Sequence, residues 1–361
     1  MSVLERNRYL LAQPFSKNVE TYLCPISKSK NEVSDGLKIA GGWRFFNELR
    51  VIQKKENVFS ESIMTPLKLI EEAKNESKEA LQEAENVIDS ITNKRLSFSN
   101  LNMSQPHVMG IINSTPDSFY KKSRSTNSSF AIKKSNQMIS DGASIIDIGG
   151  ESSRPGAKKI SIEEEMQRVI PSIIDFKKNN LVTQISLDTR NLPTMKLGLE
   201  SGVDIINDIS GFADHNKIKF VSKFNLPVIV MHMQNEPNNM QIEPKYSFAP
   251  IDIYKILSKR VNLLIQMGVN KSNIVVDPGI GFGKNIYHNL EILRNVSLFH
   301  SLGVPILIGL SRKTFIHEVV VKGYKYEGIT KRLISPTKRL SGSLAFAMHA
   351  YKNGIQIIRT H

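Results

Sequence analysis

Short apolar runs alternate with longer amphipathic segments through the second part of the chain. From about residue 105, eight runs rich in β-branched residues recur, at 107–113, 144–150, 184–189, 204–210, 228–233, 273–279, 305–311 and 355–361. Most are nearly continuous in apolar residues, which is typical of parallel strands covered on both faces. The segments between them, such as 162–178 and 250–268, have the spacing of amphipathic helices. The pattern predicts an α/β fold, a (β/α)8 TIM barrel over residues 101–361.

A doubly wound parallel sheet is the alternative, but the Gly-rich turn that would follow its first strand is absent. In a barrel, the carboxyl ends of the strands meet on one face, where the active sites of such enzymes lie. Nearly every predicted strand ends in a polar residue: Asn113, Glu151, Asp188, Asn207, His232, Asp277, Ser311 and Arg359. The sequence therefore predicts a binding site on that face.

Residues 1–100 have a different pattern and form an N-terminal extension of unknown role. The segment 37–52 is consistent with short strands paired around the turn at Gly41 and Gly42. Residues 66–91 read as one long helix with a narrow apolar stripe, which is typical of a helix that leans on a partner.

The charge is uneven: the formal net charge is +14, and the first 100 residues hold 15 Lys and Arg against 14 Asp and Glu. A basic surface attracts polyanions. However, the chain has no zinc-finger spacing, RNA-binding aromatic signature or arginine-rich tract, so we predict no nucleic-acid partner and read the scattered lysines as solvated surface.

Segments that would direct the chain to a membrane or an oxidising compartment are missing from the sequence. No apolar run approaches the roughly 18 residues that a membrane span needs, so we predict no membrane partner. The first dozen residues lack an apolar core, and Cys24 is the only cysteine, which excludes an internal disulfide and a thiolate zinc cluster. A cytoplasmic location is the expectation.

Seven motifs follow one another in the order found in a known family: IINSTPDSF (111–119), GASIIDIGGESSRPGA (142–157), ISLDT (185–189), INDISG (206–211), DPGIGFGK (277–284), SRK (311–313) and IIRTH (357–361). Residues 107–361 thereby resemble the dihydropteroate synthases. The resemblance implies the same barrel and a transferase of folate biosynthesis. Its small-molecule substrates would be 6-hydroxymethyl-7,8-dihydropterin diphosphate and 4-aminobenzoate, and its products 7,8-dihydropteroate and diphosphate. A homodimer and a Mg²⁺ cofactor are also implied.

For the pterin ring, the resemblance points to Asp277, with Asp188 and Asn207 as further partners. A carboxylate suits this task because the ring presents a guanidine-like edge of hydrogen-bond donors. The alternative, structural role of one isolated aspartate is that of a helix N-cap. Three polar residues that end three different strands favour the functional reading.

For the diphosphate, the resemblance assigns Arg359, His361 and Asn113, which the closed barrel would bring together because its first and last strands are neighbours. Asn113 and Asp117 would contribute to the magnesium site, since Mg²⁺ prefers hard oxygen ligands and substrate phosphates. A turn residue after Pro116 is the alternative reading of Asp117.

For aminobenzoate, the resemblance points to Lys313 and to the start of the helix at Thr314, where backbone donors suit a carboxylate. DPGIGFGK is not a phosphate loop, because Pro278 and Asn285 stand at deciding places. Its glycines would instead display Phe282, for which a core position is the alternative. Lys313, Asp277 and Arg359 are the predicted catalytic residues, and the other predicted substrate-binding residues on this side are Ser153, Arg154, Phe282, Arg312 and Thr314.

The sequence departs from the family in three places. In the first loop, Lys121, Lys122 and Arg124 replace an acidic residue and two glycines, which puts the acidic part of the metal site in doubt. No eighth helix follows the last strand. We expect the helix at 66–91 to take its place against the outer face of strands one and eight, with simple truncation of the sequence as the alternative. The extension itself has no assigned activity. A methyltransferase-type or non-catalytic pterin-binding barrel is the alternative function.

Overall fold

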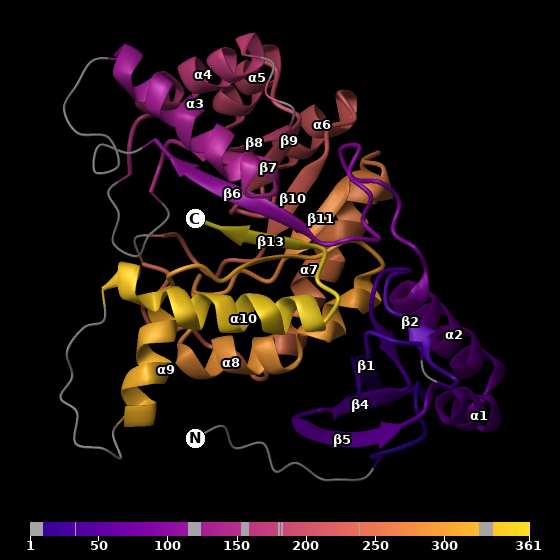
Figure 1. Ribbon diagram of the computed structural model, residues 1–361. Coiled ribbons are helices and arrows are strands. Elements are labelled where there is room, and N and C mark those ends of the chain that lie inside the picture. The colour runs from indigo at the N-terminus through magenta and orange to yellow at the C-terminus, as the bar shows by residue number, and fades with distance from the viewer. Residues whose placement is uncertain are drawn as a thin grey trace.

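The computed structural model of the chain describes residues 10–32, 34–114, 124–152, 159–179, 181, 183–237, 239–324 and 335–361. These residues form a barrel and an N-terminal region beside it (Figure 1). Among them, no helix is long and apolar enough to cross a membrane.

Eight parallel strands make the barrel, in the order β11-β10-β9-β8-β7-β6-β13-β12. An isolated parallel bridge between Val276 and Ile306 joins the two outer strands of that order. The predicted barrel is thus confirmed and the doubly wound sheet excluded. The strands are β6 (His107–Asn113), β7 (Ala143–Gly149), β8 (Gln184–Asp188), β9 (Ile205–Asp208), β10 (Val228–Met231), β11 (Ile274–Asp277), β12 (Leu307–Gly309) and β13 (Ile357–Thr360).

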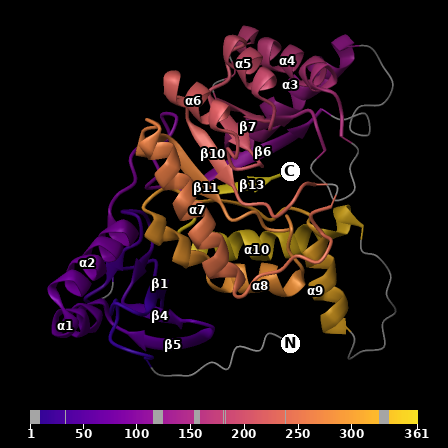
Figure 2. The same ribbon diagram turned by 180° about the vertical axis from the view of Figure 1, so that it is seen from behind.

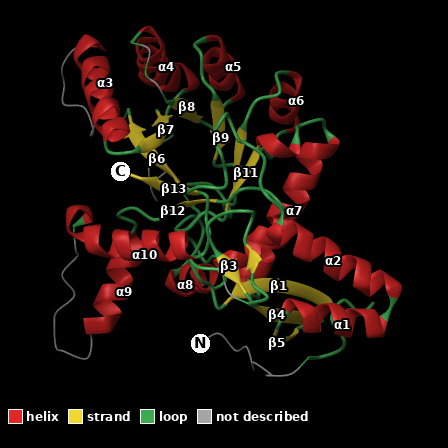
Figure 3. Ribbon diagram, turned by 45° about the vertical axis from the view of Figure 1, so that its right-hand side comes forward, coloured by secondary structure: helices red, strands yellow, loops and turns green. Residues whose placement is uncertain are grey.

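Helices surround the strands (Figure 3). The helix α4 shows why they form where they do: the Ser161 side chain caps its first turn, three glutamates follow, and two lysines stand in its last turn. The helices and 3₁₀ turns of the barrel are α3 (Arg124–Ser140), α4 (Ile162–Lys178), α5 (Leu192–Glu200), α6 (His215–Lys223), α7 (Ala249–Gln266), η1 (Lys271–Asn273), α8 (Ile286–Arg294), η2 (Val296–Leu302), α9 (Thr314–Tyr324), η4 (Pro336–Arg339) and α10 (Leu340–Lys352).

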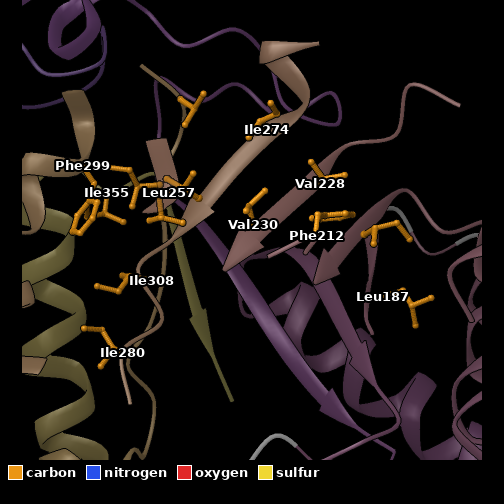
Figure 4. Packing of buried hydrophobic residues seen from close by; sticks show 14 of the residues in the cluster. Leu187, Phe212, Val228, Val230, Leu257, Ile274, Ile280, Phe299, Ile308 and Ile355 are labelled. Carbon is orange, nitrogen blue, oxygen red and sulfur yellow. The ribbon is translucent and has the colours of Figure 1, made fainter. Parts of the chain in front are cut away.

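Two apolar layers hold the barrel together. The outer layer lies between strands and helices and includes Leu187, Val230, Leu257 and Ile308 (Figure 4). The inner layer consists of Met109, Ile145, Ile205, Ile229, Val275, Leu307 and Ile357, together with Phe98 and Met103 from the segment that precedes β6. Because strand side chains alternate between the two faces, this inner layer fixes which residues point into the barrel.

The N-terminal region has its own sheet and core. Its antiparallel sheet has the order β1-β4-β5, and a short hairpin pairs Leu37 with Phe46, as the turn at Gly41 and Gly42 predicted. Its elements are β1 (Glu20–Ile26), β2 (Leu37–Lys38), β3 (Phe45–Phe46), β4 (Glu48–Lys55), β5 (Val58–Met64), α1 (Pro66–Glu76) and α2 (Lys78–Thr92).

The prediction of one helix over residues 66–91 is wrong. Ser77 has an extended backbone, with φ −167° and ψ 168°, and it separates α1 from α2. Its side chain accepts a hydrogen bond from the Ala80 amide at 3.0 Å and so caps the second helix. A serine that caps is more stable there than as an interior helical residue, and the apolar stripe alone did not reveal the break.

The expected packing of this segment against strands one and eight is also wrong. Ile70, Ile88 and Ile91 pack in a cluster with Leu49 and Val51 of the N-terminal sheet. The region contacts the barrel at η2 through α2 and β1 and at α7 through the other face of its sheet, away from the end of β13 (Figure 2). The apolar stripe therefore faces the region's own sheet. Of this region's strands, the sequence pattern predicted only the short ones over 37–52.

Two sets of polar contacts tie the region to the barrel. The Ser297 hydroxyl in η2 donates to the Pro25 carbonyl at 2.8 Å, and Arg50 donates to the Asn295 side chain at 2.9 Å. On α10, Trp43 Nε1 donates to the Tyr351 carbonyl at 3.2 Å, and the Trp43 ring stacks on the Tyr351 ring with centroids 5.7 Å apart. The N-terminal region is thus seated on the barrel by buried hydrogen bonds as well as apolar surface.

Candidate active site

The inward-facing positions change from apolar to polar at the carboxyl ends of the strands. Ile145, Ile205, Val275 and Ile357 belong to the inner layer, and two residues further along each strand stand Asp147, Asn207, Asp277 and Arg359. Two residues are one strand period, so the polar set faces the same interior as the apolar set beneath it. The sequence thereby builds a polar chamber on an apolar floor.

Arg359 joins two aspartates across this chamber. Its Nε atom donates to Asp147 at 2.7 Å, and its NH2 group donates to Asp188 at 2.7 Å. Burial lowers the pKa of Arg359, but Asp147 and Asp188 outweigh burial and raise it above its ordinary value. Burial raises the pKa of the Asp188 carboxyl to about 7, against the opposing effect of Arg359. Arg359 is a fixed cation in the middle of the site.

Asp147 is a member of the site that our reading of the sequence did not identify. Its carboxylate is fully buried, accepts from Ser186 at 2.7 Å and lies 3.3 Å from the Asn207 amide nitrogen. A signal was present, because an aspartate within the apolar run of β7 must find partners when it is buried. Asp147 links Arg359 and Asn207 and so orients two predicted substrate-binding residues.

Asp277 and Lys313 form the other half of the site. The Asp277 carboxylate is 6% exposed and accepts from the Gly279 amide at 2.7 Å. Burial raises its pKa, and Lys313 opposes that rise. Burial lowers the pKa of Lys313 to about 8, with Asp277 as the opposing charge. The two groups therefore interact electrostatically.

The loop that follows Asp277 places Phe282 against Lys313. The Lys313 Nζ atom lies 4.7 Å from the centre of the Phe282 ring and donates to the Ile280 carbonyl. Phe282 is 8% exposed and packs with Ile209, Met231 and Met240. The ring is buried, as its alternative as a core residue requires, and it also lies beside Lys313; its display toward a substrate stays a prediction.

Two buried groups hold this loop from behind, and sequence reasoning gave them no role beyond the strand-end position of His232. Lys284 Nζ lies 3.0 Å from His232 Nδ1 and 2.8 Å from the Phe282 carbonyl. Both side chains are almost fully buried. The available signal for Lys284 was its place in DPGIGFGK, directly after the last of three alternating glycines.

The SRK segment lies where β12 joins α9. Thr314 is the first residue of α9, as predicted. Arg312 has φ +56° and its backbone is held by two bonds, from its amide to the Ser343 hydroxyl at 2.9 Å and from Arg339 to its carbonyl at 2.9 Å. Its side chain is exposed. His361 Nδ1 lies 3.1 Å from the Ser311 hydroxyl, so the last residue stays beside this segment.

Only some of the predicted metal-binding and loop residues lie within the described residues. Asn113 ends β6 opposite Gly149 of β7 and is half-buried at the same mouth. Asp117, Ser153, Arg154, Lys121 and Lys122 lie outside the described residues, and Arg124 is described only as the first residue of α3. Within the described ranges, no group of three or more His, Cys, Asp or Glu is arranged to hold a metal ion.

Taken as chemistry, the chamber offers two kinds of group. Carboxylates and an amide at strand ends can accept hydrogen bonds from a donor-rich ligand, while Arg359 and Lys313 supply positive charge. Asp188 and Asn207 are paired residues of adjacent strands, so their side chains approach one ligand edge together.

Comparison with known proteins relates the chain to one family. The family described as "Pterin binding enzyme" matches residues 109–361. Dihydropteroate synthase of Escherichia coli (strain K12) is 39% identical over 263 residues, covering 73% of this chain and 89% of the relative. Dihydropteroate synthase of Haemophilus influenzae is 38% identical over 72% of this chain and 90% of its own.

Solved structures agree with the sequence relatives. The Yersinia pestis dihydropteroate synthase in complex with a sulfonamide drug has a TM-score of 0.65 and 36% identity, over 72% of this chain and 90% of that chain. The Xanthomonas albilineans synthase with 4-aminobenzoic acid has a TM-score of 0.64 and 32% identity, over 72% and 89%. The same enzyme has also been solved with 7,8-dihydropteroate, at a TM-score of 0.62. All three cover the barrel's share of the chain.

Proposed function

The chain belongs to the pterin-binding enzyme family, among the dihydropteroate synthases, and we propose that its barrel mouth carries out that family's condensation. The enzyme is a transferase of folate biosynthesis. It joins 6-hydroxymethyl-7,8-dihydropterin diphosphate to 4-aminobenzoate and gives 7,8-dihydropteroate and diphosphate. The observation that carries this proposal is the inward set of Asp188, Asn207 and Asp277 with Arg359 and Lys313 beside it.

The pterin binds first to the acceptor side of the chamber. Asp277 takes the two-pronged contact with the donor edge of the ring, because a buried carboxylate forms strong charge-assisted bonds. Asn207 and Asp188 take the remaining polar edge, and Asp147 holds Asn207 and Arg359 in position for it. Binding at three strand ends orients the ring for one direction of attack.

The bond between the methylene carbon and the diphosphate oxygen then breaks, and both electrons leave with the oxygen. Positive charge is spread over the electron-rich dihydropterin. The neutral amine of aminobenzoate attacks from the opposite side, forms the carbon–nitrogen bond and loses one proton to solvent. Arg359 stabilises the departing charge, and Lys313 positions the amine substrate beside Phe282. A strong general base is not required.

We further propose Mg²⁺ as the cofactor. Asn113 is the described oxygen donor at the diphosphate end, and it suits a hard cation whose other ligands include phosphate oxygens. Asp117 would be the second protein ligand. When bound, the ion would neutralise part of the diphosphate charge. Removal of the metal with a chelator should abolish turnover, and readdition should restore it. Full activity in the chelator would exclude this part of the proposal.

A homodimer in the cytoplasm completes the proposal. Leu340, Leu344 and Met348 are exposed at successive turns of α10, more than half of each side chain being accessible. This stripe supports a second copy of the chain as its cover, because exposed apolar stripes of this kind mark interfaces. A monomer in sedimentation experiments, or a dimer unaffected by Leu344→Glu, would contradict the assignment. The cytoplasmic location awaits cell fractionation.

Release of diphosphate is the test of the activity. The purified full chain should release it only when the pterin diphosphate, 4-aminobenzoate and Mg²⁺ are all present. Tight pterin binding without release would favour a non-catalytic barrel. Binding of methyltetrahydrofolate in preference to the diphosphate ester would favour the methyltransferase type.

A further inference from the structure

We propose that Lys284 and His232 are positioning residues that set the affinity for 4-aminobenzoate by holding Phe282 against Lys313. The proposal rests on the proposed function, since it concerns the second substrate of that reaction. It concerns two buried groups to which the condensation itself gives no step.

The two side chains meet behind the loop that follows β11. Lys284 is 3% exposed and His232 is 4% exposed. The lysine nitrogen lies 2.8 Å from the Phe282 carbonyl, 3.0 Å from His232 Nδ1 and 3.4 Å from the His232 carbonyl. One amine therefore connects the loop of β11 to the end of β10.

The loop needs such a connection because its backbone can form few regular bonds of its own. Gly279 and Gly283 have φ of +68° and +59°, and each lies against the segment after β10. A Cβ atom at Gly279 would come 2.0 Å from the His232 carbonyl oxygen. Close approach of these two segments is therefore possible only for glycine, and it brings Lys284 within reach of both backbones.

A second contact supports the same loop. The Tyr246 hydroxyl donates to the Gly283 carbonyl at 2.8 Å, and its ring lies 6.0 Å from the His232 ring. The carbonyls of Phe282 and Gly283 are thus held by side chains from two directions. With its backbone held at these carbonyls and its ring packed among Ile209, Met231 and Met240, Phe282 has its ring centre 4.7 Å from Lys313 Nζ.

The chemistry of the pair suits positioning better than charge supply. Burial lowers the pKa of Lys284 well below its ordinary value, with Asp277 opposing, and burial likewise lowers that of His232. The lysine acts through its directed hydrogen bonds to carbonyls. A shorter or apolar side chain would leave the carbonyls of Phe282 and His232 without the lysine as their hydrogen-bond donor.

Lys284→Met is the direct test, because methionine has nearly the length and volume of lysine but no nitrogen. We expect the KM for 4-aminobenzoate to rise about tenfold, which corresponds to the loss of one to two net hydrogen bonds. The affinity for the pterin diphosphate, measured by calorimetry on the full chain, should change less than twofold. Tyr246→Phe is the matched control: it removes one bond to the neighbouring carbonyl and should give a smaller shift in the same direction.

An effect on stability alone would look different. If both substrates lose affinity equally, or if the KM for aminobenzoate is unchanged in a folded Lys284→Met protein, the positioning role is excluded. Should Lys284→Met fail to fold, Lys284→Gln keeps a donor that is too short to reach both carbonyls, and the same two outcomes apply. Absence of turnover in the wild type would reject the proposed function instead, and calorimetry with 4-aminobenzoate, in the presence of pterin and diphosphate, would then compare the wild type with Lys284→Met.

Discussion

The barrel and the N-terminal region differ in how their stability and chemistry are arranged. In the barrel, apolar and polar layers are stacked along the same strands, so one set of side-chain positions serves both the core and the site. In the N-terminal region, one face of the sheet packs on α1 and α2 and the other face packs on the barrel at α7 and η2, and polar contacts attach the region to η2 and α10. Function is thus concentrated where strand periodicity brings distant residues together, and the flanking region supports it.

Removal of residues 1–100 should have the largest effect of the changes that test this comparison. The deletion exposes η2 and removes Phe98 from the inner apolar layer of the barrel, although every proposed catalytic residue remains. We expect insoluble or strongly destabilised protein, since each large buried side chain contributes roughly 1.5–3 kcal/mol. Thermal melting and expression in the soluble fraction measure the effect.

The variant Trp43→Ala is a milder form of this test, in which we expect the protein to stay folded. It removes the stack on Tyr351 and the bond to the Tyr351 carbonyl, and leaves the rest of the region in place. We expect a lower melting temperature with little change in KM. A deletion protein that melts like the wild type and keeps full activity would show that the region is dispensable.

The next effect belongs to the barrel interior. Arg359→Ala leaves Asp147 buried without its cationic partner, and breaking such a buried pair costs about 3–5 kcal/mol. The same change should weaken the binding of pterin diphosphate far more than that of the bare hydroxymethyl pterin. Urea unfolding and calorimetry separate the two effects. Arg359→Lys, which keeps the charge, should lose less in both; equal losses for the two ligands would place Arg359 in the structure alone.

Asp277→Asn should have a smaller effect, on binding and not on the fold. The amide keeps the shape of the side chain and can still accept from the Gly279 amide, but it loses charge-assisted bonds of roughly 1.5–3 kcal/mol to the pterin. Calorimetry should therefore show a loss of affinity of at least tenfold with an unchanged melting temperature. Unaltered pterin affinity would remove Asp277 from the pterin site.

Both regions show how far the sequence predicts the molecule. The eight barrel strands and the helix over 162–178 were predicted within a few residues, because buried parallel strands form apolar runs that stand out. Asp188, Asn207, Asp277 and Arg359 were placed correctly at strand ends by the same pattern. Lys284 and Asp147 had no assigned role, because their importance lies in contacts with segments distant in sequence.

The N-terminal region was predicted less well for a physical reason. Its sheet is covered on one face by α1 and α2 and on the other by α7 and η2, yet polar and charged residues interrupt its strands, so they do not form the apolar runs of the barrel strands. The break at Ser77 depends on one capping bond within a continuous apolar stripe. Tertiary contacts decide where the helical segment 66–91 packs, because its apolar stripe could cover either the N-terminal sheet or the outer face of the barrel.

The smallest expected effect is on pH dependence. Burial raises the pKa of Asp188 to about 7, above its value near 4 in an unfolded chain. Folding therefore takes up a proton between these values, and the contribution of Asp188 to the free energy of unfolding is present below pH 4 and is lost as the pH rises through 7. Asp188→Asn should flatten the pH dependence of unfolding between pH 4 and 7. An identical profile in the variant would exclude a raised pKa.

The central claim is that the inward polar positions at the strand ends form one substrate site, and a crystal structure with the pterin diphosphate bound tests it most directly. We predict that the donor edge of the ring contacts Asp277, with Asp188 and Asn207 at its other polar groups, and that the diphosphate lies within hydrogen-bonding distance of Arg359. A pterin bound outside the barrel mouth, or a diphosphate with no contact to Arg359, would contradict the account.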